Sequence, residues 1–392
     1  AFRGFGVPQA AIMQETLYDR LAEKCGLDRL AFRQLNALQD GDISVCGQQL
    51  NSAGISECLD ALAAPWQTAL AAAAEFNARS TARKRGVGVA SCWYGCGNTS
   101  LPNPSTIRLG VTAEGRLVLH QGATDIGQGS NTVITQICAD ALGLPIAAFE
   151  LVGPDTALTP DCGKTSASRQ TFVTGNAALA SGKALRQSIL RLANMSDAAE
   201  LTLADGVLSA REGGRSQVID LARMPADDHG YVIAAEETYD PPTAPLDENG
   251  QGVPYAIYGY GAQIAEVEVD LALGVTKVLK VTAAHDLGRV INPLLAEGQI
   301  EGGVAQGLGL ALMEEYLPGR TENLHDYLIP TTGDMPHVES ILVEKPDPEG
   351  PMGARGLGEH VLIPTAPAIF NAIRHASGAE IDFAPALPHR IR

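Results

Sequence analysis

The chain has 392 residues, of which 45% are hydrophobic and 19% charged. This composition excludes a disordered chain and allows two or three compact units around a sizeable core. A formal net charge of −17 argues against a nucleic-acid partner, because proteins that bind the phosphate backbone concentrate Lys and Arg. No apolar stretch reaches the roughly 18 to 20 residues that cross a bilayer, and the opening AFRGFGVPQA is not a secretory leader. We expect a soluble protein without a membrane span.

The seven cysteines are odd in number and scattered along the chain. Only Cys92 and Cys96 lie close together, as C-x3-C without a second pair, and this spacing fits neither a zinc ribbon nor iron–sulfur ligands. Free cysteines behave as small hydrophobic residues. The pattern therefore indicates reduced thiols and a cytoplasmic protein.

The first part of the chain is predicted to be helical. Apolar residues at three and four spacing from Gln9 to about Leu38 predict two amphipathic helices broken near Gly26. The Ala- and Leu-rich segment 55–76 predicts a further helical stretch. A basic, polar connector, NARSTARKRG, follows it, so we expect a boundary between units near residue 80.

Beyond this boundary, short β-type runs are separated by helical stretches. The runs are GVGVASCWYG, TIRLGVTAEGRLVLHQGAT and QIAEVEVDLALGVTKVLKVTAAHD, and the last two contain AEG and ALG turns that favour hairpins. Helices are expected over residues 131–142, 174–194 and 298–316. The mixture predicts an α+β fold. The dinucleotide, P-loop and serine-hydrolase motifs GxGxxG, GxxxxGK[ST] and GxSxG are absent.

One glycine-rich loop, HQGATDIGQG, leads directly into a predicted helix. Ser130 is the expected N-cap, and Gly143 with Pro145 terminates the helix. Free backbone N–H groups at a helix N-terminus suit a phosphate or another anionic oxygen. A capped helix after a tight turn explains the same residues, so the loop alone leaves both interpretations open.

Two other segments repeat this donor-rich chemistry. DCGKTSASRQTFVTG places hydroxyls and amides ahead of an Ala/Gly-rich helix, where they can bind an extended polar ligand or tie down a loop. In AEGQIEGGVAQGLG, Gln299 and Gln306 are seven residues apart, so a helix places both amides on one face. The small residues of that helix allow close approach by a cofactor or by another helix.

A single carboxylate, Glu359, ends the glycine-spaced loop GPMGARGLGEH before an apolar run that looks helical. No second acid, histidine or cysteine stands beside it at motif spacing. Three donor loops, one acid and no cluster of metal ligands together fit a large pterin or nucleotide-like cofactor that brings its own metal ligands.

Four segments in this order resemble the molybdopterin-binding region of the xanthine dehydrogenase/aldehyde oxidase family. They are AFRGFGVPQ, HQGATDIGQG, YGYGAQIAEVEVD with INPLLAEGQIEGGVAQGLG, and GARGLGEHVLIPTAPAIFNAI. The resemblance covers essentially the whole chain. It implies two molybdopterin-binding subdomains built of mixed sheets with packed helices. Residues 1–80 would be the end of the first subdomain, and residues 81–392 the second, with the loop of the catalytic Glu.

The resemblance also implies roles for individual residues. The molybdenum would be held by the dithiolene sulfurs of the pterin, with no side chain as a metal ligand. Glu359 would be the general base that takes the proton of a metal-bound hydroxide, whose oxygen attacks an electron-poor carbon. Phe5 would pack against a planar substrate, and Trp93 and Tyr94 either stack on such a ring or serve as packing residues. The residues implied to bind the cofactor are Arg3, Gly127, Gln128, Gly129, Ala167, Ser168, Gln170, Thr171 and Gln299.

The family's first cofactor-binding segment and its iron–sulfur and flavin modules do not stand in this sequence. The chain also begins without Met, so we expect a cut piece, a processed chain or one subunit of a split enzyme. The implied partners are a subunit with the other half of the molybdenum site, iron–sulfur and FAD subunits, and a small aromatic or aldehyde substrate. The cofactor would be molybdenum with molybdopterin, in the plain or the cytosine dinucleotide form.

Three functions follow from the resemblance. The first is hydroxylation of a carbon in an N-heterocycle, such as a purine or nicotinate-like ring, with water as oxygen donor. The second is oxidation of an aldehyde to its acid by the same centre. The third is a noncatalytic structural half of such a complex. The loop ASCWYGCGNTSLPNPS differs from the pattern of the family's purine enzymes, which leaves the substrate open.

Overall fold

A computed structural model describes residues 2–98 and 102–392. The helices are α1 Val7–Lys24, α2 Arg29–Leu35, α3 Ile55–Ala61, α4 Ala63–Arg79, α5 Ser130–Leu142, α6 Gly175–Ala193, α7 Pro293–Leu312, α8 Thr365–Ser377 and α9 Pro388–Ile391. The strands are β1 Arg83–Cys96, β2 Ser105–Thr112, β3 Leu117–Gln121, β4 Phe149–Val152, β5 Glu200–Ala204, β6 Val207–Glu212, β7 Arg215–Ile219, β8 Tyr231–Tyr239, β9 Ile257–Asp270, β10 Val275–Asp286 and β11 His337–Val343.

The chain forms two compact units. Unit 1 contains residues 1–95, 258–347 and 357–392, and unit 2 contains residues 96–257 and 348–356. The expected boundary near residue 80 falls inside unit 1, between the end of α4 and the start of β1. Contact-based units and family subdomains are different divisions of a chain, so the assignment of residues 1–80 and 81–392 stays a prediction.

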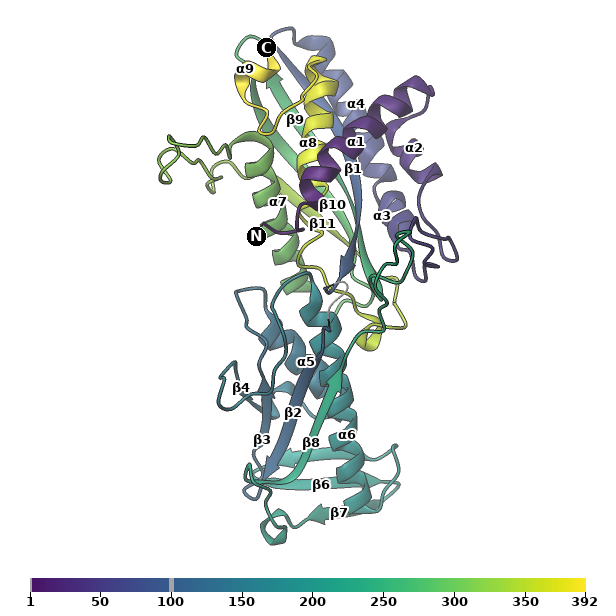
Figure 1. Cartoon of the computed structure of the whole chain (residues 1–392), viewed down its shortest axis with the longest axis vertical. Coiled ribbons are helices and arrows are strands. Elements are labelled where there is room, and N and C mark those ends of the chain that lie inside the picture. Colours follow the sequence, from purple (N-terminus) through teal and green to yellow (C-terminus); the bar gives the residue numbers. More distant parts are fainter. Residues whose placement is uncertain (1, 99–101) are drawn as a thin grey trace. The chain divides into compact units, whose positions relative to one another are not determined.

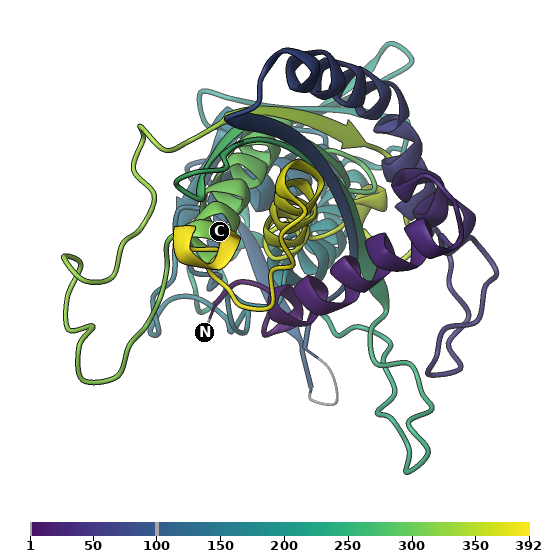
Figure 2. The ribbon, with the colours of Figure 1, turned by 90° about the horizontal axis from the view of Figure 1, so that it is seen from above.

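Unit 1 is built on a sheet with the strand order β1-β9-β10-β11. The predicted hairpin is confirmed, because β9 and β10 pair antiparallel from Asp270 and Val275 onward, while β11 adds to β10 in parallel. Helices α7 and α8 pack against one face of this sheet (Figure 2). Gly86 and Gly88 of β1 permit this contact, since a Cβ at either position would overlap the backbone of α8.

Unit 2 contains a sheet of order β4-β3-β2-β8 and a smaller sheet of order β5-β6-β7 (Figure 1). The second predicted hairpin is confirmed as the antiparallel pair β2 and β3, while β4 joins β3 in parallel. Helices α5 and α6 pack on each other, and α6 packs against β2 and β8. Both units therefore combine mixed sheets with packed helices, which confirms the α+β prediction.

Most predicted helices are present with shifted ends. The break near Gly26 separates α1 from α2, but the stretch from Ile55 is divided at Leu62 into α3 and α4. The expected helix from residue 174 begins at Gly175, after a π-helical turn over Gln170–Thr174. Ser130 was expected as an N-cap and this is wrong, because Gly129 occupies the cap with a φ of 83° and Ser130 is the first helical residue.

Candidate functional site

In unit 1, the turn that contains Arg3 and Gly4 contacts the loop of Glu359. Arg3 donates from Nε to the Gly358 carbonyl oxygen at 2.6 Å, and the Gly4 N–H donates to Glu359 Oε2. Arg3 and Glu359 are more than 350 positions apart in the sequence. The fold therefore places two of the residues implied by the family resemblance side by side.

The turn that carries Arg3 depends on left-handed backbone. Gly4, Phe5 and Gly6 have φ values of 92°, 50° and 87°, a region that residues with a Cβ rarely adopt. Such strain persists where the surrounding structure imposes it and is frequent at functional sites. The Phe5 side chain is 58% exposed, so it is available to another molecule rather than part of the core.

Arg3 joins this turn to helix α7. Its Nη2 donates to Gln299 Oε1 at 3.0 Å, and its Nη1 donates to Gln306 Oε1 at 3.2 Å. The prediction that the two amides share one helical face is thus confirmed. Burial lowers the pKa of Arg3, and the carboxylate of Glu359 opposes that shift; an arginine nonetheless stays charged in proteins.

The loop after Glu359 is fixed to β1 and β9 through its backbone. Cys92 Sγ lies 3.5 Å from the His360 carbonyl oxygen, and Gln263 Nε2 donates to the Val361 carbonyl oxygen at 2.7 Å. The His360 ring is fully buried beside His285, with ring centroids 5.3 Å apart. Each of these contacts comes from a different element, so Glu359 stands on a well-supported segment.

Trp93 and Tyr94 have different surroundings in unit 1. Trp93 stacks on Tyr258 with ring centroids 4.7 Å apart, whereas Tyr94 is buried and packs with Ala11 and Ile363. For Tyr94 the packing interpretation is therefore the one that its environment supports. Residues 99–101 of the expected substrate loop lie outside the described residues.

In unit 2, the loop before α5 satisfies part of its own donor set. The Asp125 carboxylate accepts hydrogen bonds from the N–H groups of Gly127, Gly129 and Asn131 at 2.8, 3.3 and 3.0 Å. Burial opposes ionisation of Asp125, but these backbone donors outweigh it and lower its pKa. The capped-turn interpretation of this loop accounts for these three N–H groups, and the assignment of Gly127, Gln128 and Gly129 to cofactor binding stays a prediction. Sequence reasoning missed Asp125, although an Asp two residues before a Gly is a familiar turn signal.

Gln128 is held by the same loop. Its Oε1 accepts from the Ile126 N–H at 2.6 Å, and its Nε2 donates to the Thr124 carbonyl oxygen at 3.3 Å. The loop is linked to the segment 161–171 by the Thr165 hydroxyl, which also donates to the Thr124 carbonyl, at 2.7 Å. Two of the three donor-rich segments predicted from the sequence therefore lie side by side in unit 2.

The second segment is organised by Arg169, which sequence reasoning also missed. This side chain is 1% exposed and donates to carbonyls of Asn103, Pro104, Cys162 and Lys164. Burial lowers the pKa of Arg169. A lone charged residue within the small, polar run TSASRQT is the signal that sequence reasoning passed over.

The predicted binding residues around Arg169 adopt an unusual backbone. Ala167 and Ser168 have consecutive φ values of 52° and 54°, and Ala167 O accepts a hydrogen bond from Gly97 N at 2.7 Å. Gln170 is buried and donates to Lys164 O at 3.0 Å, while Thr171 is half-buried. Phe5, Ala167 and Ser168 are thus three predicted site residues that are not glycine but have a left-handed backbone.

Several buried polar atoms in unit 2 have no hydrogen-bond partner within the described part of the chain. They are Gln121 Oε1, Ser130 Oγ and Ser166 Oγ, all in or beside the two adjoining loops. Buried polar atoms without partners are uncommon in folded proteins. An extended, polar ligand with donors and acceptors would satisfy them, so these loops fit a large polar cofactor.

We searched the described residues for side chains that could hold a metal ion. Over residues 2–98 and 102–392, no group of three or more His, Cys, Asp or Glu side chains is arranged to hold a metal ion. The seven cysteines form no disulfide. None of the helices in these ranges combines the length and hydropathy that a bilayer crossing requires.

Unit 2 thus carries the adjoining donor loops with their unpartnered oxygens, and unit 1 carries the supported acid. Two family models described as molybdopterin cofactor-binding domains match residues 1–37 and 61–336. The chain belongs to the molybdopterin cofactor-binding domain family.

Known relatives agree with this assignment. The putative xanthine dehydrogenase molybdenum-binding subunit of Escherichia coli (strain K12) is 32% identical, over 100% of this chain and 52% of that protein. The crystal structure of the aldehyde oxidoreductase from Desulfovibrio desulfuricans matches with a TM-score of 0.87 and 32% identity, over 100% of this chain and 41% of that one. Quinoline 2-oxidoreductase from Pseudomonas putida matches with a TM-score of 0.85 and 25% identity, over 100% of this chain and 52% of that one. The chain thus spans about half the length of the proteins it matches.

Proposed function

We propose that this chain is the molybdenum-binding part of a hydroxylase that acts on an electron-poor carbon of an N-heterocycle, with water as oxygen donor. The observation that carries the proposal is the meeting of Arg3, Gly4 and Glu359 at one point of unit 1. Two of the relatives, a xanthine dehydrogenase subunit and quinoline 2-oxidoreductase, carry the names of N-heterocycles. Their names support this substrate class.

The residues of unit 2 would hold the pterin cofactor. The unpartnered oxygens of Gln121, Ser130 and Ser166 would bind its polar edge, with Gln128, Ala167, Ser168, Gln170 and Thr171 from the same two loops. From unit 1, the family resemblance implies Arg3 near the oxo group of the cofactor and Gln299 as an amide that contacts the pterin. When bound, the molybdenum cofactor supplies an oxygen nucleophile and accepts two electrons from the substrate.

Glu359 would act as the general base. Its carboxylate would take the proton of the oxygen nucleophile, and the Gly4 N–H, which donates to Oε2, would orient it. The Arg3 guanidinium would balance the negative charge in this partly buried place. Phe5, exposed beside Arg3, would pack against the flat face of the substrate.

Oxidation of an aldehyde to a carboxylic acid by the same residues is the second candidate. The similarity to an aldehyde oxidoreductase, over the whole of this chain, favours it. A planar ring and an aldehyde both present an electron-poor carbon to a base. The residues that distinguish the two kinds of substrate would line the substrate pocket. We assign part of this lining to another polypeptide segment.

We propose that the active enzyme contains further parts. A segment with the other half of the molybdenum site, an iron–sulfur module and an FAD module would complete electron transfer. The two separate family matches support two cofactor-binding subdomains, and we assign residues 1–80 and 81–392 to them. Seven cysteines without a disulfide support a reducing, cytoplasmic location.

Replacement of Glu359 by Gln tests the function in the complete molybdenum protein. We expect an unchanged molybdenum content by mass spectrometry and a fall in turnover of about 10²- to 10⁴-fold, which is the usual contribution of a general base. Glu75→Gln is the matched control, because Glu75 is an exposed acid of unit 1 that pairs only with Arg79 in the described contacts. The substrates to compare are xanthine, nicotinate, quinoline and aliphatic and aromatic aldehydes, with an electron acceptor.

Each outcome bears on one candidate. A Glu359→Gln protein that keeps its metal and its turnover contradicts the general-base role. Turnover of aldehydes alone transfers the assignment to aldehyde oxidation. A wild-type protein that contains molybdenum and turns over none of these substrates favours a noncatalytic half.

A further inference from the structure

Strand β9 presents two glycines and a glutamine on the face that supports the Glu359 loop. Gly259, Gly261 and Gln263 stand at alternate positions of the strand, so they lie on one face of it. Further along the same face, Ala265 belongs to the core that contains residues of α7 and α8. We call Gly259, Gly261 and Gln263 the β9 platform.

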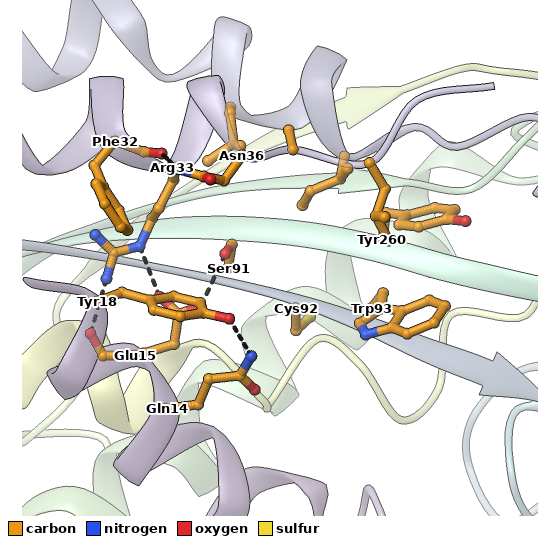
Figure 3. Close-up of a pocket in the computed structure, with 14 residues that line it drawn as sticks. Gln14, Glu15, Tyr18, Phe32, Arg33, Asn36, Ser91, Cys92, Trp93 and Tyr260 are labelled. Carbon is orange, nitrogen blue, oxygen red and sulfur yellow. Dashed lines mark hydrogen bonds and ion pairs between the residues drawn. The ribbon is translucent and has the colours of Figure 1, made fainter. Parts of the chain in front are cut away.

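The opposite face of β9 has a different environment. Tyr260, which stands between the two glycines in the sequence, lines a cavity together with Tyr18 of α1 and Phe32 of α2 (Figure 3). Successive side chains of a strand point to opposite faces. The β9 platform therefore faces away from this cavity and toward α7 and α8.

The two glycines of the platform make room for histidine rings. A Cβ at Gly259 would lie 2.4 Å from Cε1 of His360, and one at Gly261 would lie 2.2 Å from Nδ1 of His285. Ordinary contact begins at about 3.5 Å, so a larger residue at either position would displace a ring. Because His360 directly follows Glu359 in the sequence, the glycines allow the strand and the Glu359 loop to meet.

Gln263 uses both ends of its side-chain amide on the segment after Glu359. The side chain is fully buried. Its Nε2 donates to the Val361 carbonyl oxygen at 2.7 Å, and its Oε1 accepts from the Thr365 hydroxyl at 2.7 Å. A carbonyl oxygen can only accept, so the amide nitrogen must face Val361. Gln263 therefore spans the backbone from two residues after Glu359 to the first residue of α8.

His285 holds the same amide from a third side. Its Nε2 lies 3.1 Å from Gln263 Nε2. Because the amide nitrogen can only donate, this ring nitrogen must accept, which requires a neutral imidazole. Burial lowers the pKa of His285 to about 3, so the ring stays neutral at physiological pH. Both polar atoms of the Gln263 amide thus have partners, and a fully satisfied buried network specifies one arrangement.

Glu359 is held on both sides by these contacts. Before it, Arg3 donates to the Gly358 carbonyl oxygen at 2.6 Å, and after it Gln263 donates to the Val361 carbonyl oxygen. The carboxylate itself accepts from the Gly4 N–H. A shift of the segment after Glu359 would therefore move the carboxylate relative to this donor.

We propose that Gln263 is a positioning residue for Glu359. It holds the backbone from Val361 to Thr365 on the β9 platform, and His285 orients its amide, so that the Glu359 carboxylate stays at the Gly4 N–H. The inference rests on the proposed function, because Glu359 is the proposed general base. Gln263 acts through Glu359 and does not itself touch substrate or cofactor.

Gln263→Met tests the proposal in the complete molybdenum protein, because methionine has a similar length but no amide. We expect kcat to fall about 10- to 10²-fold, as for a displacement of up to about 1 Å, with unchanged KM and molybdenum content. In the Glu359→Gln background, the same substitution should change kcat by less than about twofold, because a residue that acts through Glu359 then has no base to position.

Asn371→Leu is the matched control. Asn371 is a buried amide of α8 that donates to the carbonyl oxygens of Glu15 and Val89, outside the Glu359 loop. Its loss disturbs the packing of unit 1 without touching the contacts of Gln263. Any fall in kcat should therefore be the same in the wild-type and Glu359→Gln backgrounds.

Hydrogen exchange gives a second readout that needs no turnover. The N–H groups of Ile363 and Thr365 donate within the loop to the carbonyls of His360 and Leu362, at 3.2 and 3.1 Å. These two amides should exchange at least about tenfold faster in Gln263→Met, which is the effect of losing about one buried hydrogen bond. They should exchange at the wild-type rate in Asn371→Leu.

A milder variant covers the case in which Gln263→Met does not fold. Thr365→Val removes only the hydroxyl that donates to Gln263 Oε1, and it should speed the exchange of Ile363 by about three- to tenfold.

The outcomes separate this inference from the proposed function. Faster exchange of the loop, with a fall in kcat confined to the wild-type background, supports the positioning role. Equal falls in both backgrounds, or wild-type exchange of the loop in the Gln263 and Thr365 variants, overturn it. A Glu359→Gln protein with full turnover defeats the proposed general base, and the exchange rates still decide by themselves whether Gln263 holds the loop.

Discussion

Gly356→Ala is predicted to displace the segment that carries Ala167 and Ser168. A Cβ at Gly356 would lie 1.9 Å from the Ser168 carbonyl oxygen and 2.8 Å from the Ser168 Cβ. Ordinary contact begins at about 3.5 Å, so one of the two backbones must move by about 1.5 Å. Ser168 cannot move freely, because it follows a residue already held by Gly97 and precedes the buried Arg169.

Two magnitudes follow from this displacement. Overpacking of this kind costs about 1–3 kcal/mol of unfolding free energy. A shift of about 1 Å in a group that positions a reacting molecule can reduce the rate about 10²-fold. We therefore expect a lower melting temperature and, because Ala167 and Ser168 are proposed to hold the pterin, a lower molybdenum content.

The assay compares Gly356→Ala with Gly153→Ala, a position in the same unit where an added Cβ meets no atom within 4 Å. Thermal unfolding reports the packing cost, and the ratio of molybdenum to protein reports the binding site. If the first variant matches wild type in both, the segment tolerates the displacement and our account of the binding loop is refuted. If it loses stability but retains full molybdenum, only the link to the cofactor is refuted.

Two further changes test the physical basis of unit 1. Arg33→Met leaves the buried Glu15 with the Ser91 hydroxyl and the buried Asp19 with Arg29 at 3.4 Å, and should cost about 3–5 kcal/mol in denaturant unfolding. Arg79→Met removes an exposed pair and should cost less than about 1 kcal/mol. Equal losses would contradict the role of burial. Burial and the charge of Arg29 lower the pKa of His375 to about 4 from an ordinary value of 6.5, so the unfolded chain binds this proton first and stability declines as the pH falls from 6.5 to 4. His375→Asn, which keeps an acceptor for the Val87 N–H, should show a weaker decline over this range in unfolding experiments at several pH values, and an unchanged slope would contradict this.

Local signals in the sequence were sufficient for the hairpins and most helices. The turns AEG and ALG lie between alternating apolar runs, and both produce antiparallel pairs as expected. The parallel partners β4 and β11 were not predictable in this way. They join their sheets from segments more than 25 residues further along the chain, so no turn signal marks the pairing.

In the candidate site, too, contacts between distant segments could not be predicted from local signals. Spacing alone placed Gln299 and Gln306 on one face of a helix, but only the family resemblance linked Arg3 to Glu359, because their contact spans almost the whole sequence. The loop before α5 shows a similar limit. Its sequence left open whether the glycine N–H groups face a ligand or form a capped turn, and only the structure shows that Asp125 accepts from Gly127 and Gly129.

The glycines of α7 show how the structure answers a question that the sequence left open. The sequence left open whether the small residues of that helix admit a cofactor or another helix. A Cβ at Gly303 would lie 2.6 Å from Val361 Cγ2, and one at Gly307 would lie 2.3 Å from Thr365 Cβ. These two glycines therefore serve the packing of the Glu359 loop and the start of α8 against α7.

This packing also brings Arg3 into reach of both partners. Gln299 and Gln306 lie on the part of α7 that adjoins Gly303 and Gly307, because positions three and four apart are neighbours on a helix surface. A bulkier residue at either glycine would move the loop away from α7. Arg3 could then not keep its hydrogen bond to the Gly358 carbonyl together with those to the two amides. The position of Glu359, the proposed base, thus depends on Gly303 and Gly307, which have no side chain that could take part in the reaction.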